Sequence, residues 1–303
     1  MTPGDPTSGG MMTPVGRPYL DVHAHVGDTI NRAPPCGQTV EKYLARMAQS
    51  GVVAAILCPA AGGPQGRGAL DTRDQDDAIA AACQAYPERF PLGLAIIEVR
   101  HQQAAIDEME RAMDEVGLAG FMCHPGISGH SMGEEMTPFL EVVDARGGLV
   151  LLHAMGGGSE ARIAAHARRF RRTTFIAAHV SMRAEQHRSA IDALAGLENV
   201  WVDFAQHPAT ADESWDVAAL VRAYAADRLL FGSDIPYYDY RLLQAQIESA
   251  RVDDETKDRI AWRNAAALIQ RFRPEWRLPQ EPAPSPAAFE GSDLWAGKNG
   301  RLF

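Results

Sequence analysis

Cysteine is scarce in this chain, which has four cysteines among 303 residues. Cys36, Cys58, Cys83 and Cys123 are scattered, and no two of them form a Cys-x-x-Cys pair. So few cysteines in a chain of this length do not make the pattern of a disulfide-stabilised secreted domain. The composition favours a reducing compartment, and we expect a cytoplasmic protein.

Long apolar runs and an excess of positive charge are also missing. No apolar run approaches the roughly 20 residues that a membrane-spanning helix needs. Residues 1–17 lack the basic start and apolar centre of a secretory signal. The formal net charge of −10 disfavours a nucleic-acid or anionic-membrane surface. We therefore expect a small-molecule substrate, and neither a nucleic acid nor a membrane as partner. An anionic substrate stays open, because one arginine can dominate a local site.

Eight apolar segments alternate with segments of helical pattern, in a chain long enough for one large barrel or two ordinary domains. The predicted strands are residues 19–25, 52–58, 92–99, 119–124, 149–153, 174–179, 200–204 and 228–234. They recur about every 30 residues, the size of one βα unit. Their continuously apolar runs are typical of parallel strands covered on both faces. Because the sequence has no Gly-x-Gly-x-x-Gly turn, we predict a single-domain α/β protein, a closed (β/α)8 TIM barrel, over a doubly wound open sheet.

Polar residues and glycine mark several predicted boundaries. Thr39, Thr137 and Ser159 each stand before a helical pattern, where a hydroxyl can cap the first turn. Gly51 follows the end of the first predicted helix, a common place for glycine. Residues 28–38, rich in turn-forming residues, are predicted to be a loop.

The barrel is predicted to occupy residues 18–273, between two ends of different character. Residues 1–17 are rich in Gly, Pro and Thr, and we expect a disordered N-terminal segment. Residues 274–303 are Pro-rich but carry four large aromatic side chains. We predict an extended C-terminal arm that lies on the barrel or on a partner subunit, and the second case would make the protein a homo-oligomer. A frayed tail is the alternative.

The first predicted strand ends in His23-Ala24-His25. In a strand, side chains at positions i and i+2 share one face, so the two imidazoles point the same way, roughly 6–7 Å apart. Two imidazoles at this spacing can close on one metal ion. The alternative for the pair alone is two solvent-facing histidines at a strand end.

Three more predicted strands also end in polar residues: His153, His179 and Asp234. Active sites of such barrels lie at the carboxyl ends of the strands, which would bring all five side chains to one rim. Taken singly, each could be an ordinary hydrogen-bonded residue. Together, neutral imidazoles and a carboxylate suit a divalent metal, with Zn²⁺ as our prediction and Mn²⁺, Fe²⁺ or Co²⁺ as alternatives.

Each residue of this group has a predicted role. His23, His25, His153 and Asp234 would hold the metal, and one coordination position would be left for a water that the metal activates. His179 would lie beside that water, orienting it, taking its proton or polarising a substrate oxygen. Asp234 could double as general base, because one carboxylate oxygen is expected to stay free.

The sequence resembles the amidohydrolase superfamily, specifically the amidohydrolase-related group that includes the aminocarboxymuconate-semialdehyde decarboxylase-like enzymes. The resemblance covers about residues 18–272. Its motifs are Leu-Asp-Val-His-Ala-His at 20–25, Gly-Phe-Met-Cys-His-Pro at 120–125, Leu-Leu-His at 151–153, Ala-Ala-His at 177–179, Leu-Phe-Gly-Ser-Asp-Ile-Pro at 230–236 and Arg-Asn-Ala-Ala-Ala-Leu at 263–268. The resemblance implies a metal on His23, His25, His153 and Asp234, with His179 as the catalytic histidine.

One departure from other branches of that superfamily bears on the number of metal ions. Many of its members bridge two metals with a carbamoylated lysine on the fourth strand. This chain has only Lys42, Lys257 and Lys298, and none of them ends a predicted strand. The sequence therefore predicts a mononuclear site.

Two residues are candidates for substrate binding. His124 ends the fourth predicted strand, where it contacts substrate or serves only as a hydrogen-bonding residue. Arg73 lies in a segment at the metal face and could clamp a carboxylate with two parallel hydrogen bonds. The alternative for Arg73 is an ordinary solvated side chain.

Three functions are compatible with these residues. The first is a metal-dependent hydrolase that attacks an amide, ester or lactone of a small, carboxylate-bearing substrate. The second is a metal-dependent, non-oxidative decarboxylase of an aromatic or enoic acid, which would use the same side chains. The third is a barrel without catalytic activity that serves as a binding module, and the presence of every expected ligand type argues against it.

Overall fold

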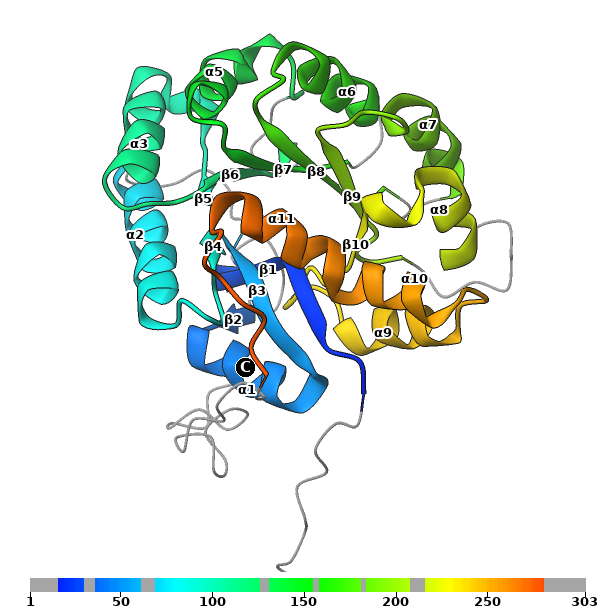
Figure 1. Ribbon diagram of the computed structural model, residues 1–303. Coiled ribbons are helices and arrows are strands. Elements are labelled where there is room, and N and C mark those ends of the chain that lie inside the picture. The colour runs from blue at the N-terminus through cyan, green and yellow to red at the C-terminus, as the bar shows by residue number, and fades with distance from the viewer. Residues whose placement is uncertain are drawn as a thin grey trace, which may run out of the picture.

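The computed structural model describes residues 16–29, 36–60, 69–125, 131–154, 158–180, 184–207 and 216–280. Within these ranges parallel strands alternate with helices, and the helices surround the strands (Figure 1). The strands are β1 (Tyr19–Thr29), β2 (Cys36–Gln38), β3 (Val52–Pro59), β4 (Leu92–Gly93), β5 (Ala95–Ile96), β6 (Gly120–Cys123), β7 (Leu149–His153), β8 (Thr174–Ala178), β9 (Val200–Asp203) and β10 (Leu229–Leu230). The α-helices are α1 (Val40–Ser50), α2 (Ala69–Ala85), α3 (Gln103–Asp114), α5 (Thr137–Arg146), α6 (Ser159–Arg169), α7 (Ala184–Leu194), α8 (Val217–Tyr224), α9 (Tyr240–Ser249), α10 (Asp254–Asp258) and α11 (Asn264–Phe272). Shorter helical segments are η1 (Val99–His101), η2 (Glu134–Met136), η4 (Ala226–Arg228) and the π-helical η5 (Arg259–Arg263).

Backbone hydrogen bonds close the parallel strands into a barrel. The strands form two sheets, β2-β1-β3-β4 and β10-β9-β8-β7-β6-β5. At one seam only Leu94 separates β4 from β5, and its N–H donates to the carbonyl of Leu57 at 2.8 Å, so the two segments form one interrupted strand. At the other seam the N–H of His25 donates to the carbonyl of Ile235 at 2.9 Å. The eight parallel strands thus make a (β/α)8 TIM barrel, and the predicted fold is confirmed.

Helix α1 shows how local sequence sets an element that packs on this barrel. Its first turn is capped by Thr39, whose hydroxyl accepts a hydrogen bond from the N–H of Lys42 at 3.2 Å. It ends at Gly51, which adopts the left-handed conformation with φ of 73°. Both predicted boundaries of this helix are confirmed.

Strand pairing changes two of the predicted elements. β1 continues past the predicted end at His25, because residues 27–29 pair antiparallel with β2. β2 itself lies inside residues 28–38, where the sequence predicts only a loop. The predicted strand 92–99 is interrupted at Leu94 and ends at Ile96. These differences depend on partner strands that the local pattern does not contain.

Two predicted helix caps are also wrong. Thr137 is the first residue of α5, and Met136 occupies the cap position without a side-chain hydrogen bond. Ser159 is the first residue of α6, and the cap position is held by Gly158 with φ of 81°. The sequence does not distinguish a serine or threonine at the cap position from one at the first position of the helix.

The amino ends of the strands form one end of the barrel, here called the base. Helix α11 crosses the base, at the near end of the barrel in Figure 1. Its side chains Leu268 and Ile269 are buried in one apolar cluster with Leu20 of β1 and Leu149 of β7. Trp276, which follows α11, is 5% exposed in the same cluster, and its indole N–H donates to the carbonyl of Glu88 at 3.0 Å. Apolar packing therefore closes this end.

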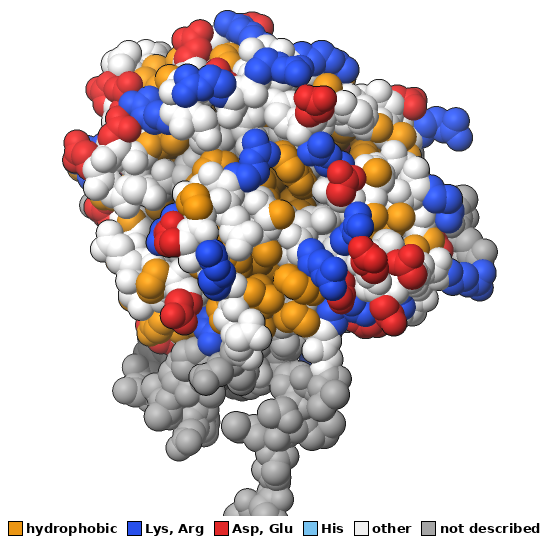
Figure 2. Space-filling model, viewed as in Figure 1, with side chains coloured by type: hydrophobic (Ala, Val, Ile, Leu, Met, Phe, Trp, Pro, Cys, Tyr) orange, Lys and Arg blue, Asp and Glu red, His pale blue; other side chains and the backbone are white. Residues whose placement is uncertain are grey.

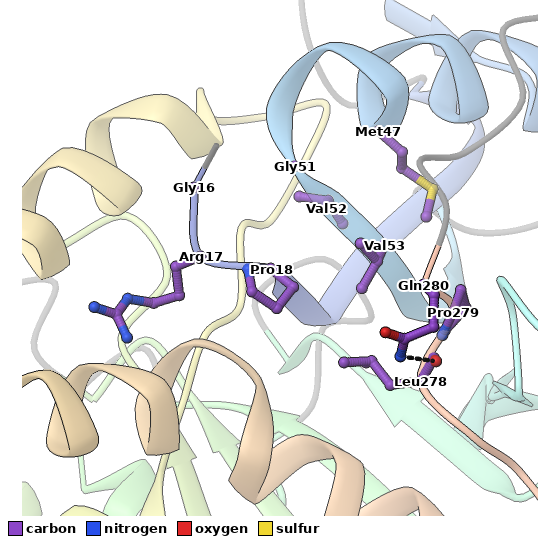
Figure 3. Close-up of a pocket in the computed structure, with 10 residues that line it drawn as sticks. All are labelled: Gly16, Arg17, Pro18, Met47, Gly51, Val52, Val53, Leu278, Pro279 and Gln280. Carbon is purple, nitrogen blue, oxygen red and sulfur yellow. Dashed lines mark hydrogen bonds between the residues drawn. The ribbon is translucent and has the colours of Figure 1, made fainter. Parts of the chain in front are cut away.

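A pocket of about 260 Å³ lies beside the base (Figure 3). Its described lining combines glycine, proline and aliphatic residues with Gln280 and one charged residue, Arg17. The guanidinium of Arg17 points away from the other lining side chains and pairs with Glu248 at 3.1 Å and with Asp254 at 3.2 Å. The pocket thus presents no group of titratable side chains.

The two predicted terminal segments fall mostly on residues 1–15 and 281–303, which lie outside the described residues. Their disorder and their packing against a partner stay predictions. None of the described helices combines the length and the apolarity that crossing a membrane requires. On the face seen in Figure 1, basic and acidic side chains are interspersed with apolar ones (Figure 2).

Candidate metal centre

Four imidazoles and one carboxylate meet at the carboxyl ends of the strands, here called the mouth of the barrel. His23 and His25 come from β1, His153 ends β7, His179 follows β8, and Asp234 lies four residues beyond β10. All five are buried, with exposures of 4% or less. The structure brings together the five side chains that the sequence singled out.

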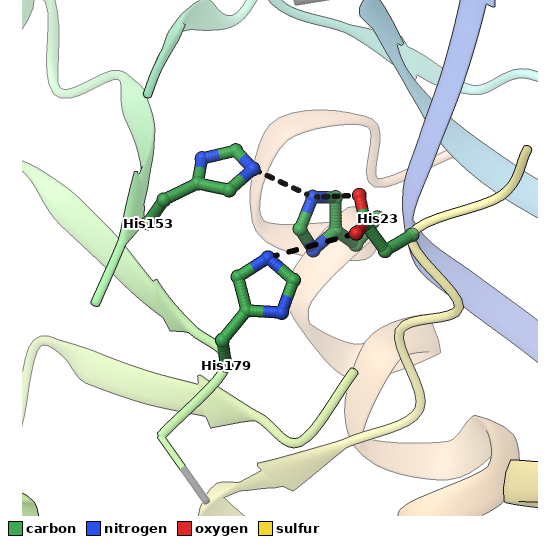
Figure 4. Close-up of side chains that lie close together, drawn as sticks. His23, His153 and His179 are labelled. Carbon is green, nitrogen blue, oxygen red and sulfur yellow. Dashed lines mark hydrogen bonds and ion pairs between the residues drawn. The ribbon is translucent and has the colours of Figure 1, made fainter. Parts of the chain in front are cut away.

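The distances between their ligand atoms are short. Nε2 of His23 lies 3.0 Å from Nε2 of His25 and 3.2 Å from Nε2 of His153. Asp234 Oδ1 lies 3.4 Å from Nε2 of His23 and 3.2 Å from Nε2 of His25. His179 approaches from the other side, with Nε2 3.8 Å from Asp234 Oδ2. Figure 4 shows the rings of His23, His153 and His179 turned toward one another.

Hydrogen bonds on the far side of each ring fix its tautomer. Nδ1 lies 2.7–3.1 Å from an oxygen acceptor in every case: Asp203 Oδ2 for His23, and the carbonyls of Pro59 for His25, of Cys123 for His153 and of Ala205 for His179. Each Nδ1 therefore carries a proton, and in a neutral ring the lone pair is on Nε2, directed at the common centre. Facing lone pairs at about 3 Å repel one another unless a positive charge lies between them. The donor set therefore fits a metal cation.

The buried charges favour the same conclusion. Burial alone lowers the pKa of a histidine, but at His23 the carboxylates of Asp203 and Asp234 outweigh burial and raise the pKa to about 9. At His153 and His179 burial prevails and lowers each pKa. Burial would raise the pKa of Asp234, but His23 and His25 hold that pKa well below its usual range. The centre thus favours one positive charge, either a proton on Nε2 of His23 or a metal ion that displaces this proton.

Two alternative sets of four ligands can be drawn from these five residues. Ligand atoms of His23, His153, His179 and Asp234 all lie within 4.8 Å of one another. His25 is equally close to the centre, because its Nε2 contacts both His23 and Asp234 within hydrogen-bond distance. If His23 and His25 of β1 are both ligands, His179 is the residue outside the ligand set. Its Nε2 then lies beside Oδ2 of Asp234.

The second oxygen of Asp234 is not free. The side-chain amide of Gln206 donates a hydrogen bond to Oδ2 of Asp234. The sequence-based hypothesis of Asp234 as general base assumes a free oxygen there, and the structure places a donor on it. Gln206 therefore holds the orientation of this carboxylate.

Three residues around the centre adopt the left-handed backbone conformation that is costly for side chains other than glycine. The φ angles are 63° at His179, 60° at Gln206 and 59° at Asp234. Each such residue costs of order 1–3 kcal/mol and persists where the surrounding contacts over-determine it. Such clustering of backbone strain is typical of functional sites.

Asp21 ties β1 to the segment that carries Asp234. One of its oxygens accepts from the hydroxyls of Tyr43 at 2.8 Å and Ser233 at 2.6 Å. The other accepts from the backbone N–H groups of Ser233 at 2.9 Å and His23 at 3.1 Å. The network fixes Ser233, the residue before Asp234, against the strand that carries two of the histidines.

The two predicted substrate residues differ in their placement. His124 follows β6 and lies against the cluster, with its ring centroid 4.6 Å from that of His153. Burial lowers the pKa of His124 to about 4. Arg73 instead is an exposed residue of α2 that pairs with Glu108 of α3 at 2.8 Å. Among the described contacts of Arg73 none reaches the cluster, so the structure does not place it there as predicted.

Sequence reasoning misses three residues that organise the centre: Asp21, Asp203 and Gln206. Asp21 and Asp203 were visible as acidic residues on otherwise apolar strands, which is unusual for buried positions without partners. Gln206 gave no such signal, because only the fold brings it to Asp234. Tyr237, whose ring centroid is 5.4 Å from that of His25, also borders the centre.

A closed parallel barrel with imidazoles and a carboxylate at its mouth is an architecture of metal-dependent barrel enzymes. A family model described as Amidohydrolase matches residues 20–271. The chain therefore belongs to the amidohydrolase family of enzymes, and the resemblance inferred from the motifs is confirmed. A search of curated proteins gives no match to this sequence.

Several solved structures share the fold. A dihydroxybenzoic acid decarboxylase from Polaromonas sp. JS666, with bound manganese and the inhibitor 2-nitroresorcinol, is 16% identical, with a TM-score of 0.62, and the match covers 84% of this chain and 97% of that one. A 5-carboxyvanillate decarboxylase from Sphingomonas paucimobilis is 15% identical, with a TM-score of 0.58 and coverage of 84% and 99%. A proposed 2-pyrone-4,6-dicarboxylic acid hydrolase from Pseudomonas putida is 20% identical, with a TM-score of 0.59 and coverage of 84% and 98%. At these identities the likeness concerns the fold.

Proposed function

We propose that this protein is a metal-dependent, non-oxidative decarboxylase of a small aromatic or enoic carboxylic acid. The observation that carries the proposal is the convergence of four Nε2 atoms and the Asp234 carboxylate on one buried centre that favours a positive charge. Decarboxylases of hydroxylated aromatic acids among the structures of the same fold support the choice of reaction.

One divalent ion per chain is part of the proposal. His23, His25, His153 and Asp234 would hold it, and it would polarise oxygens of the substrate. Imidazole and carboxylate donors suit Zn²⁺ and Mn²⁺ alike. The sequence predicts Zn²⁺ with Mn²⁺ among the alternatives, and the manganese in the Polaromonas enzyme supports a divalent metal and gives weight to Mn²⁺. The lack of a strand-ending lysine supports a mononuclear centre.

His179 is the proposed proton carrier. When a carboxyl group leaves as CO₂, its electron pair stays on the substrate carbon, and that carbon must receive a proton. Nδ1 of His179 is held by the carbonyl of Ala205, so Nε2 faces the centre and can take a proton from a substrate hydroxyl and pass it to the carbon. Burial lowers the pKa of His179, which makes its protonated form a ready donor.

The contact between Gln206 and Asp234 favours decarboxylation over hydrolysis by an Asp234 base. A general base needs an accessible oxygen, and Oδ2 already accepts a hydrogen bond from the Gln206 amide. In a decarboxylase the carboxylate is needed as a ligand only, and a second hydrogen bond that fixes its orientation is then useful.

Hydrolysis of a lactone or ester is the second candidate. The same centre would activate a water, and His179 could take the proton of that water instead of Asp234. The Pseudomonas putida protein, whose description names a hydrolase of a pyrone dicarboxylic acid, supports keeping this alternative. His124 and Tyr237 border the centre and would contact substrate in either reaction.

A substrate panel separates the two reactions. The Mn²⁺-loaded and Zn²⁺-loaded proteins would be incubated with hydroxybenzoates, including 2,6-dihydroxybenzoate and 5-carboxyvanillate, and with pyrone and aryl lactones. CO₂ release and acid release would be recorded in parallel. We expect CO₂ from at least one hydroxylated aromatic acid, and none from the variant His179→Asn with its metal still bound. Acid release from lactones without any CO₂ from the aromatic acids would contradict the proposed decarboxylase and favour a hydrolase.

A further inference from the structure

Asp203, the last residue of β9, is fully buried and lies beside two of the histidines. Its Oδ2 accepts from Nδ1–H of His23 at 3.0 Å. Its Oδ1 accepts from the backbone N–H of His179 at 3.0 Å and from that of Ala205 at 3.0 Å. One carboxylate therefore contacts the proposed metal ligand through one oxygen and the proposed proton carrier through the other.

The turn that Asp203 closes also holds the ring of His179. Ala205, whose N–H donates to Asp203 Oδ1, offers its carbonyl to Nδ1 of His179 at 3.1 Å. Both the backbone and the imidazole of His179 are thus anchored on residues 203–205. His179 has a φ of 63°, a costly conformation that persists where surrounding contacts hold it.

The partners of Asp203 suit a carboxylate and no other side chain of its size. All three partners are donors, and a carboxylate is acceptor-only. An amide of the same shape has one acceptor and one donor end. In either orientation its NH₂ group would face a donor: the His23 ring, or the two backbone N–H groups of His179 and Ala205.

We propose that Asp203 is a positioning residue that sets the geometry of His23 and His179 together. It neither binds the metal nor touches the reacting atoms. It fixes the Nδ1–H tautomer of His23, and through the turn at residues 203–205 it fixes the direction of Nε2 of His179. Asp203 therefore supports both the proposed metal ligand His23 and the proposed proton carrier His179. The assignment of those two roles rests on the proposed function.

The variant Asp203→Asn tests this proposal without any substrate. Nitrogen NMR of the metal-free full-length protein reports the tautomer of each histidine ring. We expect the ring signals of both His23 and His179 to change in the variant. His166 of α6 serves as the internal control, because its Nε2 is held by the carbonyl of Met132 at 2.8 Å and it is not one of the five residues of the centre.

Cobalt provides the second readout. Co²⁺ added to the full-length protein gives visible absorption that reports ligand geometry, and a titration gives the dissociation constant. Loss of an outer-sphere partner typically weakens metal binding about 10–100-fold. We expect a rise of that size in the Co²⁺ dissociation constant of Asp203→Asn, with an altered spectrum.

Asp144→Asn is the matched control. Asp144 also uses one carboxylate oxygen to accept from two backbone N–H groups, those of Arg172 and Thr173 at 2.9 Å each, but it does so next to the amino end of β8. This variant should leave all four histidine signals and the Co²⁺ affinity as in the wild type.

Three results would overturn the proposal. A change at His23 without one at His179 would remove the shared role, a change that extends to His166 would mean general loosening, and a Co²⁺ affinity within twofold of the wild type would remove the link to the centre. If Asp203→Asn does not fold, through-hydrogen-bond couplings in the wild type decide. We expect couplings from the Asp203 carboxyl carbon to the amide nitrogens of His179 and Ala205, and an absent His179 coupling refutes the idea. Lack of any decarboxylation or hydrolysis would overturn the proposed function but leave these readouts intact.

Discussion

The two ends of the barrel are built from the same eight strands but differ in chemistry. At the base, Leu268, Ile269 and Trp276 pack with apolar strand residues, and the pocket beside them carries no titratable cluster. At the mouth, histidines and acidic residues are buried to the same degree. The described part of the chain thus has an apolar cluster across the base and its group of buried histidines and carboxylates at the mouth.

The difference shows where stability and function reside. Buried polar groups are costly unless each has a partner, and at the mouth even partnered groups leave facing lone pairs and strained backbone. At the base, Leu268, Ile269 and Trp276 pack with apolar neighbours instead. We therefore expect substitutions at the base to change stability without changing metal binding, and substitutions of the metal-centre residues at the mouth to change metal binding.

The largest expected effect on stability is at the base end of β6. A Cβ on Gly120 would lie 1.9 Å from the carbonyl oxygen of Leu149, and the φ of Gly120 is 152°. Gly120→Ala should therefore cost about 4 kcal/mol or more of the free energy of unfolding, measured by urea denaturation. Gly117→Ala is the control, because Gly117 has φ of 80° but open space around it, and it should cost about 1–2 kcal/mol. Equal losses in the two variants would mean that the close approach of β6 and β7 is unimportant.

The next effect concerns the apolar cluster at the base. Leu268 of α11 is 1% exposed, so Leu268→Ala should lower the free energy of unfolding by about 2–5 kcal/mol. Its Mn²⁺ affinity should match the wild type. Leu242→Ala, at a leucine that is 49% exposed on α9, should change both quantities little. A Leu268→Ala variant with weakened metal binding would show that the two ends are not independent.

At the mouth the largest effect is expected on metal binding. Asp234→Asn removes the negative charge that faces His23 and His25. We expect the Mn²⁺ affinity to fall about 100-fold or more, at least as much as for loss of an outer-sphere partner. Asp239→Asn, in the same loop but paired with the exposed Arg241, is the control. Unchanged metal affinity in Asp234→Asn would remove Asp234 from the ligand set.

The smallest predicted effect involves Asp76 of α2, which accepts from the N–H of Ile96 at 2.9 Å near the mouth end of β5. Burial raises the pKa of Asp76 well above its usual value. The folded state therefore binds this proton more tightly than the unfolded state, so its contribution to stability is complete below about pH 4 and is lost as pH rises. Asp76→Asn should be more stable than the wild type at pH 8, and the difference should shrink toward pH 4. Denaturation curves at both pH values that run parallel would contradict this.

The sequence was sufficient for the barrel and for the five side chains of the centre. His153, His179 and Asp234 each follow an apolar run that predicts a parallel strand, and His23 and His25 lie on the first predicted strand. The topology of the barrel then brings the five side chains together. The supporting residues were not predictable in the same way. Asp203 and Gln206 act on partners of distant sequence number, and β2 forms only because β1 runs on to pair with it. The pairing of Arg73 on α2 with Glu108 of α3 was not predictable either, because the two residues are brought together only by the packing of the two helices.

The central claim is that the mouth holds one metal ion, and metal analysis after equilibrium dialysis against Mn²⁺ tests it most directly. We predict one equivalent of Mn²⁺ per wild-type chain and none per chain of His153→Ala, with both proteins folded. A wild-type chain that retains no metal, or a His153→Ala chain that retains a full equivalent, would contradict the claim.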